Sequence, residues 1–150
     1  PESTDEIMAE WMEMAGDLYT TSVPVKPGVR AYLEKCKADG ERMAVLTSSV
    51  PAHCHAALGH LGLKPYFEQI YFAQELGMDK KDPAIYEKTA RLLGVSPEAC
   101  TIFDDSIAAC RSARAAGMTV VGVYDEFFHV SWHEMQSVCH RCIRSFQELL

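Results

Sequence analysis

The chain has 150 residues, of which 48% are hydrophobic and 23% charged, and its formal net charge is −7. This length suits one domain that buries roughly 70% of the unfolded chain's surface, and the composition excludes a disordered tail, a collagen-like repeat and a coiled coil. The negative charge argues against a nucleic-acid partner, and no apolar run approaches the roughly 18 residues of a membrane span. With no secretory leader visible, we expect a cytoplasmic protein whose six cysteines are reduced.

The first predicted element is a helix near the start of the chain. Ser3 and Glu6 have the spacing of a capping box, and apolar residues follow at helical spacing as far as Leu18. Two prolines then mark residues 20–28 as a connection. We therefore expect residues 1–22 to form a unit separate from the rest of the chain.

Helical and strand patterns alternate after this connection. Helical periodicity predicts helices over 29–39, 51–61, 83–93 and 107–116, two of which begin with proline and several of which end at glycine. A capping box at 131–134 predicts the start of a further short helix. Short apolar runs predict strands at 43–46, 70–73, 100–103 and 119–123, with a last one at 143–146. This alternation predicts an α/β fold whose parallel sheet is covered by helices on both faces.

Two of the predicted strands end in polar clusters. The strand over 43–46 leads into Thr-Ser-Ser at 47–49, and the strand over 100–103 leads into Asp-Asp-Ser at 104–106. Ligands of open α/β sheets bind at these carboxyl ends. Hydroxyls there also cap helices, but adjacent buried carboxylates repel each other and usually need a cation nearby. Between the clusters, the lysines of residues 79–82 precede a helix, where a lysine can reach a phosphate oxygen.

The joint order of these segments resembles the haloacid dehalogenase (HAD) superfamily of phosphohydrolases, in the branch with beta-phosphoglucomutase-like and phosphoglycolate phosphatase-like proteins. The segments that carry the resemblance are 43–49, 80–86, 103–106 and 115–118. The resemblance implies a HAD-like, Rossmann-like three-layer α/β core with a parallel sheet over residues 23–150. Residues 1–22 would then be the C-terminal part of a helical cap, and the first strand of the core would be missing.

The resemblance also implies roles at the first polar cluster. Thr47 occupies the position whose hydroxyl hydrogen-bonds the transferring phosphoryl group. Ser48 and Ser49 follow it, and we expect their backbone N–H groups to add phosphate donors.

The lysine and the acidic pair receive roles in the same way. Lys80 occupies the position of the catalytic, phosphate-binding lysine, and Lys81 is the alternative because it replaces the first proline of the usual Lys-Pro-x-Pro pattern. Asp104 and Asp105 match the acids that hold Mg²⁺ in the family, and this cation prefers oxygen ligands.

The chain departs from the family at the nucleophile. The family uses the first Asp of an Asp-x-Asp motif on its first core strand, and this sequence contains no Asp-x-Asp. The resemblance implies an Mg²⁺-dependent phosphohydrolase or phosphotransferase that acts on a small phosphorylated metabolite through a phosphoaspartyl intermediate, with this chain alone inactive. We expect the slot between the strands ending at Thr47 and Asp104 to be filled by a missing N-terminal segment or another copy, or to be closed by direct pairing.

Other interpretations remain open. A non-catalytic HAD-like binding module would have the same sequence features. A zinc-binding module is indicated weakly by His and Cys residues at positions 53–55, 129, 133 and 139–142. A phosphorelay receiver domain is disfavoured because its acidic pair comes first in the chain. We expect Asp125 and Glu126, which follow the fourth strand, to be solvated.

Overall fold

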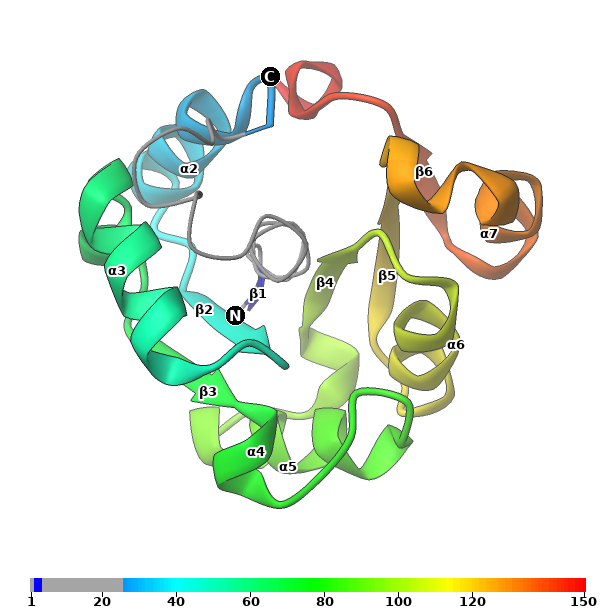
Figure 1. Cartoon of the computed structure of the whole chain (residues 1–150), viewed down its shortest axis with the longest axis horizontal. Coiled ribbons are helices and arrows are strands. Elements are labelled where there is room, and N and C mark those ends of the chain that lie inside the picture. The colour runs from blue at the N-terminus through cyan, green and yellow to red at the C-terminus, as the bar shows by residue number, and fades with distance from the viewer. Residues whose placement is uncertain (1, 4–25) are drawn as a thin grey trace.

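The computed structural model describes residues 2–3 and 26–150, with side chains from Lys26 onward. Its centre is a six-stranded sheet of order β3-β2-β1-β4-β5-β6, in which every described pairing is parallel (Figure 1). The strands are β1 (Glu2–Ser3), β2 (Met43–Thr47), β3 (Gln69–Phe72), β4 (Thr101–Asp104), β5 (Thr119–Val123) and β6 (Arg141–Ile143). The predicted parallel α/β sheet is therefore confirmed.

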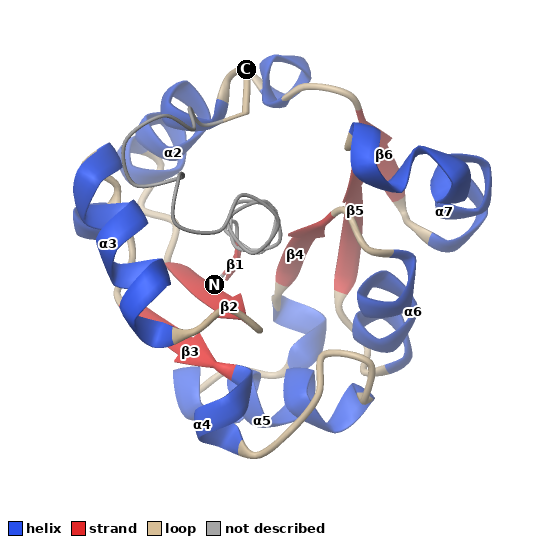
Figure 2. Ribbon diagram, viewed as in Figure 1, coloured by secondary structure: helices blue, strands red, loops and turns tan. Residues whose placement is uncertain are grey.

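Helices cover both faces of this sheet (Figure 2). The α-helices are α2 (Val29–Ala38), α3 (Pro51–Leu61), α4 (Ala73–Leu76), α5 (Pro83–Leu93), α6 (Ile107–Ala115) and α7 (Trp132–Val138). Short 3-10 helices are η2 (Lys64–Tyr66), η3 (Pro97–Ala99), η4 (Glu126–Ser131) and η5 (Phe146–Leu149). None of the helices in the described part of the chain is long and apolar enough to cross a membrane.

The core is divided between the two faces of the sheet. Successive side chains of a strand point to opposite faces. Val45 and Phe103 accordingly pack with α2 and α3, whereas Leu46 and Ile102 pack with α5 and α6. Figure 1 shows the resulting three layers, with α2 and α3 on one side of the sheet and α5, α6 and α7 on the other.

The helix boundaries that flank the candidate site follow from local sequence. Helix α5 begins with Pro83 in its first turn, where Asp82 caps it by accepting a hydrogen bond from the backbone of Ala84. Helix α6 begins after Ser106, whose hydroxyl accepts from the backbone of Ala109. These caps fix the two loops that carry the predicted lysine and the predicted acidic pair.

The end of the chain differs from the prediction. The last strand covers Arg141–Ile143 and not 143–146, because Ser145 opens η5 with a capping box that includes Glu148. The capping box predicted at Ser131 is absent. Ser131 already has helical backbone angles, since η4 runs directly into α7, and its side chain makes no cap hydrogen bond.

The slot between β2 and β4 is filled by the chain's own residues. Glu2 aligns with Met43 and Thr101, and β1 pairs in parallel with both neighbouring strands. The sequence had placed residues 1–22 in a cap remnant and expected another filler, so Glu2 and Ser3 correct that expectation, while residues 4–22 lie outside the described part. One intervening strand holds β2 and β4 about 9.6 Å apart, which leaves room for a phosphoryl group between their ends.

Candidate active site

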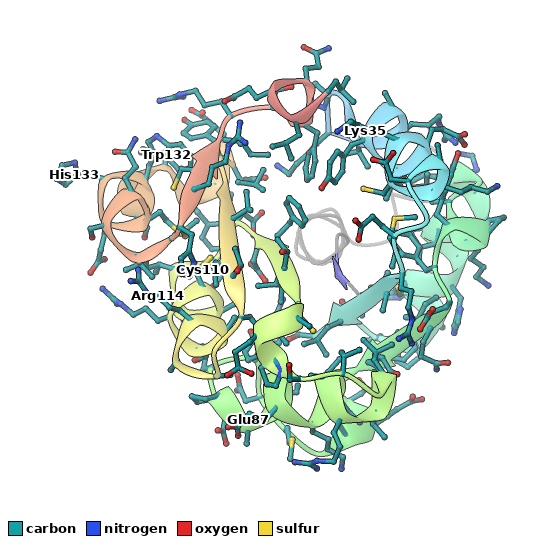
Figure 3. All side chains as sticks on the ribbon, turned by 180° about the vertical axis from the view of Figure 1, so that it is seen from behind. Lys35, Glu87, Cys110, Arg114, Trp132 and His133 are labelled. Atoms are coloured by element: carbon teal, nitrogen blue, oxygen red, sulfur yellow. The ribbon has the colours of Figure 1, made fainter. Side chains whose placement is uncertain are left out.

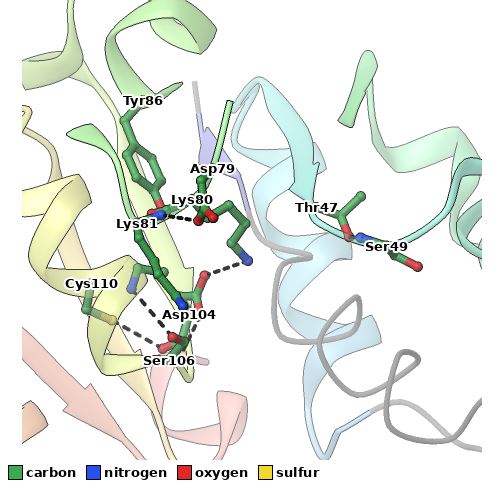
Figure 4. A network of polar contacts seen from close by, with 10 residues as sticks. Thr47, Ser49, Asp79, Lys80, Lys81, Tyr86, Asp104, Ser106 and Cys110 are labelled. Atoms are coloured by element: carbon green, nitrogen blue, oxygen red, sulfur yellow. Dashed lines mark hydrogen bonds and ion pairs between the residues drawn. The ribbon is translucent and has the colours of Figure 1, made fainter. Parts of the chain in front are cut away.

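A buried ion pair joins the loop before α5 to the end of β4. Lys80 Nζ lies 3.2 Å from Asp104 Oδ2, and the two side chains are only 5% and 1% exposed (Figure 4). Lys81 is exposed. Because a buried charge is costly unless it is paired, this contact orients both side chains at the carboxyl edge of the sheet. Of the two candidate lysines, the structure therefore brings Lys80 to the acidic pair.

The acidic pair lies at the end of β4 and is almost completely buried. Asp104 is 0% and Asp105 1% exposed, and Asp104 Oδ1 accepts a 2.8 Å hydrogen bond from the Ser106 backbone N–H. Among the described residues, no group of three or more His, Cys, Asp or Glu side chains could hold a metal ion. Mg²⁺ needs only one or two protein carboxylates because it keeps several waters. Asp104 and Asp105 offer carboxylate oxygens as metal ligands, so this pair fits Mg²⁺.

The hydroxyl cluster ends β2 at the same edge of the sheet, with β1 between it and the acidic pair (Figure 4). Thr47 is fully buried, and its Oγ1 accepts a 2.9 Å hydrogen bond from the Ser49 backbone N–H. The sequence predicted that this N–H group donates a hydrogen bond to phosphate, but in the structure it donates to Thr47 Oγ1. The Ser49 hydroxyl, in contrast, is buried without a hydrogen-bond partner in the described part of the chain. Ser48 is exposed.

Comparison with known proteins identifies the family. The family described as haloacid dehalogenase-like hydrolase matches residues 3–117. The chain belongs to this family. The resemblance inferred from the ordered motifs and the Rossmann-like fold class are thus confirmed.

Individual HAD relatives are similar over part of their length. The chain is 36% identical over 108 residues to Protein CbbY of Rhodobacter capsulatus, a match that covers 70% of this chain and 48% of that protein. It is 40% identical over 81 residues to the fructose-1-phosphate phosphatase YqaB of Escherichia coli, covering 54% and 43%. A HAD-like protein of unknown function from Agrobacterium tumefaciens superposes with a TM-score of 0.77 at 26% identity, covering 95% and 65%. The chain thus spans about half the length of the curated relatives it matches.

Two residues that the sequence did not indicate hold the loop of this candidate site. The Tyr86 hydroxyl on α5 donates a 2.7 Å hydrogen bond to the Lys80 carbonyl, and the Ser112 hydroxyl on α6 donates one of 2.6 Å to the Lys81 carbonyl. Asp79 accepts a bond from the Lys81 backbone N–H. Tyr86 ends the segment 80–86 that carries the family resemblance, but the sequence indicated no role for its hydroxyl. A buried tyrosine usually finds a partner for its hydroxyl, which is the signal that could have identified it.

Removing the Tyr86 hydroxyl is expected to destabilise the protein. The Tyr86→Phe variant leaves the Lys80 carbonyl without this buried donor, and an unsatisfied buried group costs about 1–3 kcal/mol. The midpoint of urea unfolding measures the loss. Tyr124→Phe is the matched control, because Tyr124 donates to Glu126 at the exposed surface and its loss should cost less than about 0.5 kcal/mol. Equal losses in both variants would contradict the anchoring role of Tyr86.

Asp125 is not solvated as the sequence suggested. Its side chain is 8% exposed and forms an ion pair with Lys26, which is 14% exposed. Both residues line a cavity of about 550 Å³ at the carboxyl ends of β5 and β6. The guanidinium of Arg144, also at this cavity, lies 4.5 Å from the Tyr124 ring centre. Glu126 is exposed, as expected.

The histidines proposed for zinc have other neighbours. His129 Nδ1 lies 2.9 Å from the Glu126 carbonyl oxygen, and His140 Nδ1 accepts a hydrogen bond from the Val120 backbone N–H. No metal-binding group of three or more ligand side chains occurs within residues 26–150, so that part of the chain gives the zinc interpretation no support.

Proposed function

We propose that the chain carries the phosphate- and Mg²⁺-binding part of a HAD phosphohydrolase or phosphotransferase that acts on a small phosphorylated metabolite in the cytoplasm. The observation that supports this most is the buried Lys80–Asp104 ion pair beside Asp105, at the edge of the sheet where α/β folds bind ligands. The similarity to a fructose-1-phosphate phosphatase favours a sugar phosphate as substrate. The six free thiols are consistent with a reducing compartment.

The hydroxyls and the lysine bind the phosphoryl group in this proposal. The Ser49 N–H donates to Thr47 Oγ1, so the Thr47 hydroxyl keeps its own proton to donate to a phosphoryl oxygen. The Ser49 hydroxyl offers a second donor. Lys80 is held in place by its ion pair and by the anchored loop, and its ammonium neutralises charge that develops on the phosphoryl oxygens.

Asp104 and Asp105 would hold Mg²⁺. When bound, the cation neutralises phosphate charge and orients the phosphoryl group for in-line attack. The Ser106 N–H fixes one oxygen of Asp104, so this carboxylate keeps a defined orientation toward the site. The ammonium of Lys80 limits the repulsion between the two acids at the same edge.

In this proposal the chain does not supply the catalytic nucleophile. A phosphoaspartyl intermediate requires an Asp at the end of the central strand, and the sequence contains no Asp-x-Asp motif. We therefore propose that these 150 residues bind the ligand and the metal but do not catalyse turnover unaided. A non-catalytic HAD-like binding module would share this site and this inactivity.

Mg²⁺ binding tests the proposed metal site. Isothermal titration of the chain with Mg²⁺, in the presence of inorganic phosphate, should show binding that Asp105→Asn weakens at least about 10-fold, because a carboxylate ligand is lost. Asp39→Asn is the charge-matched control, since Asp39 is exposed at the end of α2, and it should leave the affinity unchanged. Equal affinities of the wild type and Asp105→Asn would contradict the metal assignment.

A further inference from the structure

Two cysteine sulfurs meet at one glycine of the sheet. Cys139 follows α7, and Cys142 lies in β6, where it pairs with Gly122 of β5. A Cβ atom on Gly122 would lie 2.8 Å from Cys139 Sγ and 3.2 Å from Cys142 Sγ. Both sulfurs therefore occupy the space that a side chain at position 122 would fill, and they are direct neighbours.

The two thiols differ in access and acidity. Strand β6 is an edge strand, and Cys142 is partly exposed, whereas Cys139 is buried. Hydrogen bonds from the thiols of Cys110 and Cys142 lower the pKa of Cys139 despite its burial. Burial and the neighbouring Cys139 raise the pKa of Cys142 to about 11. The thiolate is the reactive form of cysteine, so Cys139 is the better nucleophile and Cys142 is placed to react second.

We propose that Cys139 and Cys142 form a reversible dithiol–disulfide site that a small peroxide oxidises. The Cys139 thiolate attacks one oxygen of hydrogen peroxide, the O–O bond breaks, and Cys139 becomes a sulfenic acid as hydroxide leaves. The sulfur of Cys142 then attacks the sulfenic sulfur, forming the S–S bond and releasing the second oxygen as water. Two thiols and one peroxide thus give one disulfide and two waters.

The Cys139–Cys142 pair lies near the acidic pair, but its oxidation does not depend on the proposed phosphohydrolase function. Asp104, Gly122 and Cys142 align in one row across β4, β5 and β6, so Cys142 is two strand spacings, about 9.6 Å, from Asp104. Cys110 lies on α6 beside these strands (Figure 3). Its thiol donates to the Asp104 carbonyl at 3.7 Å (Figure 4). Cys110 also adjoins Cys139 and is the competing partner, but it is buried, whereas Cys142 is partly exposed on the edge strand. We therefore assign Cys142 as the resolving partner of Cys139.

Peptide mapping tests the proposal directly. The folded chain is treated with a small molar excess of hydrogen peroxide, its remaining thiols are alkylated, and it is digested with trypsin. Cleavage after Arg141 separates the two cysteines into peptides 115–141 and 142–144. We expect the chain to lose two of its six free thiols and to yield these two peptides joined by a disulfide that dithiothreitol reverses.

Two variants provide the comparison. In Cys142→Ser no disulfide should form, and dimedone should trap a sulfenic acid on Cys139. Cys100→Ser, at a buried cysteine that donates to the Ser96 carbonyl away from the pair, should still form the disulfide. Retention of all six thiols, or a link between 115–141 and the peptide 92–111, which contains Cys100 and Cys110, would overturn the proposal.

Discussion

The 150-residue chain is expected to hydrolyse p-nitrophenyl phosphate at least about 10⁴-fold more slowly than a full-length HAD phosphatase, even with saturating Mg²⁺. The reason is chemical. In the proposed site Thr47 and Lys80 would bind and neutralise a phosphoryl group, but neither can form a phosphoaspartyl intermediate, and the sequence has no Asp-x-Asp motif to supply the covalent route. A steady-state assay alongside the similar fructose-1-phosphate phosphatase YqaB of Escherichia coli measures the difference.

A variant separates true turnover from contamination in this assay. Asp104→Asn should leave any residual rate unchanged, because a trace contaminant does not depend on this residue. Mg²⁺-dependent turnover at a rate near that of YqaB, abolished by Asp104→Asn, would show that the chain supplies its own nucleophile and would contradict this part of the account.

Removing the buried cation should destabilise the fold strongly. Lys80→Met leaves Asp104 and its neighbour Asp105 buried without the ammonium 3.2 Å away, and breaking one side of a buried pair costs about 3–5 kcal/mol. The double variant Lys80→Met/Asp104→Asn removes both charges and should recover at least about 1 kcal/mol of this loss. Urea unfolding without Mg²⁺ measures both values.

An exposed ion pair supplies the control for this cycle. Glu68 and Arg42 form a pair whose side chains are 39% and 45% exposed, so Glu68→Gln should cost less than about 1 kcal/mol. If Lys80→Met is no more destabilising than Glu68→Gln, or if the double variant gains nothing over Lys80→Met, the ion pair does not organise the site.

Much of the fold could be predicted from the sequence because its signals are local. Pro83 and Gly94 delimit α5, and the apolar runs of β2 and β5 lie within a residue of their observed bounds. The strand-end rule placed Thr47 and Asp104 at one edge of the sheet, since parallel strands share their carboxyl ends. The family resemblance added a lysine there but left Lys81 as an alternative to Lys80, and the contact with Asp104 decides between them.

The remaining features depend on contacts that are remote in sequence. The entry of Glu2 and Ser3 into the sheet is set by the open edges of β2 and β4, and no local pattern in the first residues shows it. The burial of Asp125 depends on Lys26, 99 residues away. The role of Tyr86 depends on where the Lys80 carbonyl lies after folding.

We propose that Thr47, Lys80 and the acidic pair together bind one phosphate and one Mg²⁺ at the edge of the sheet. A crystal structure of the chain grown with Mg²⁺ and tungstate, a phosphate analogue with strong anomalous scattering, tests this most directly. We expect tungstate within hydrogen-bond distance of the Thr47 hydroxyl and Lys80 Nζ, and Mg²⁺ on the oxygens of Asp104 and Asp105. Tungstate bound elsewhere, with Lys80 still closed onto Asp104 and no cation beside Asp105, would contradict it.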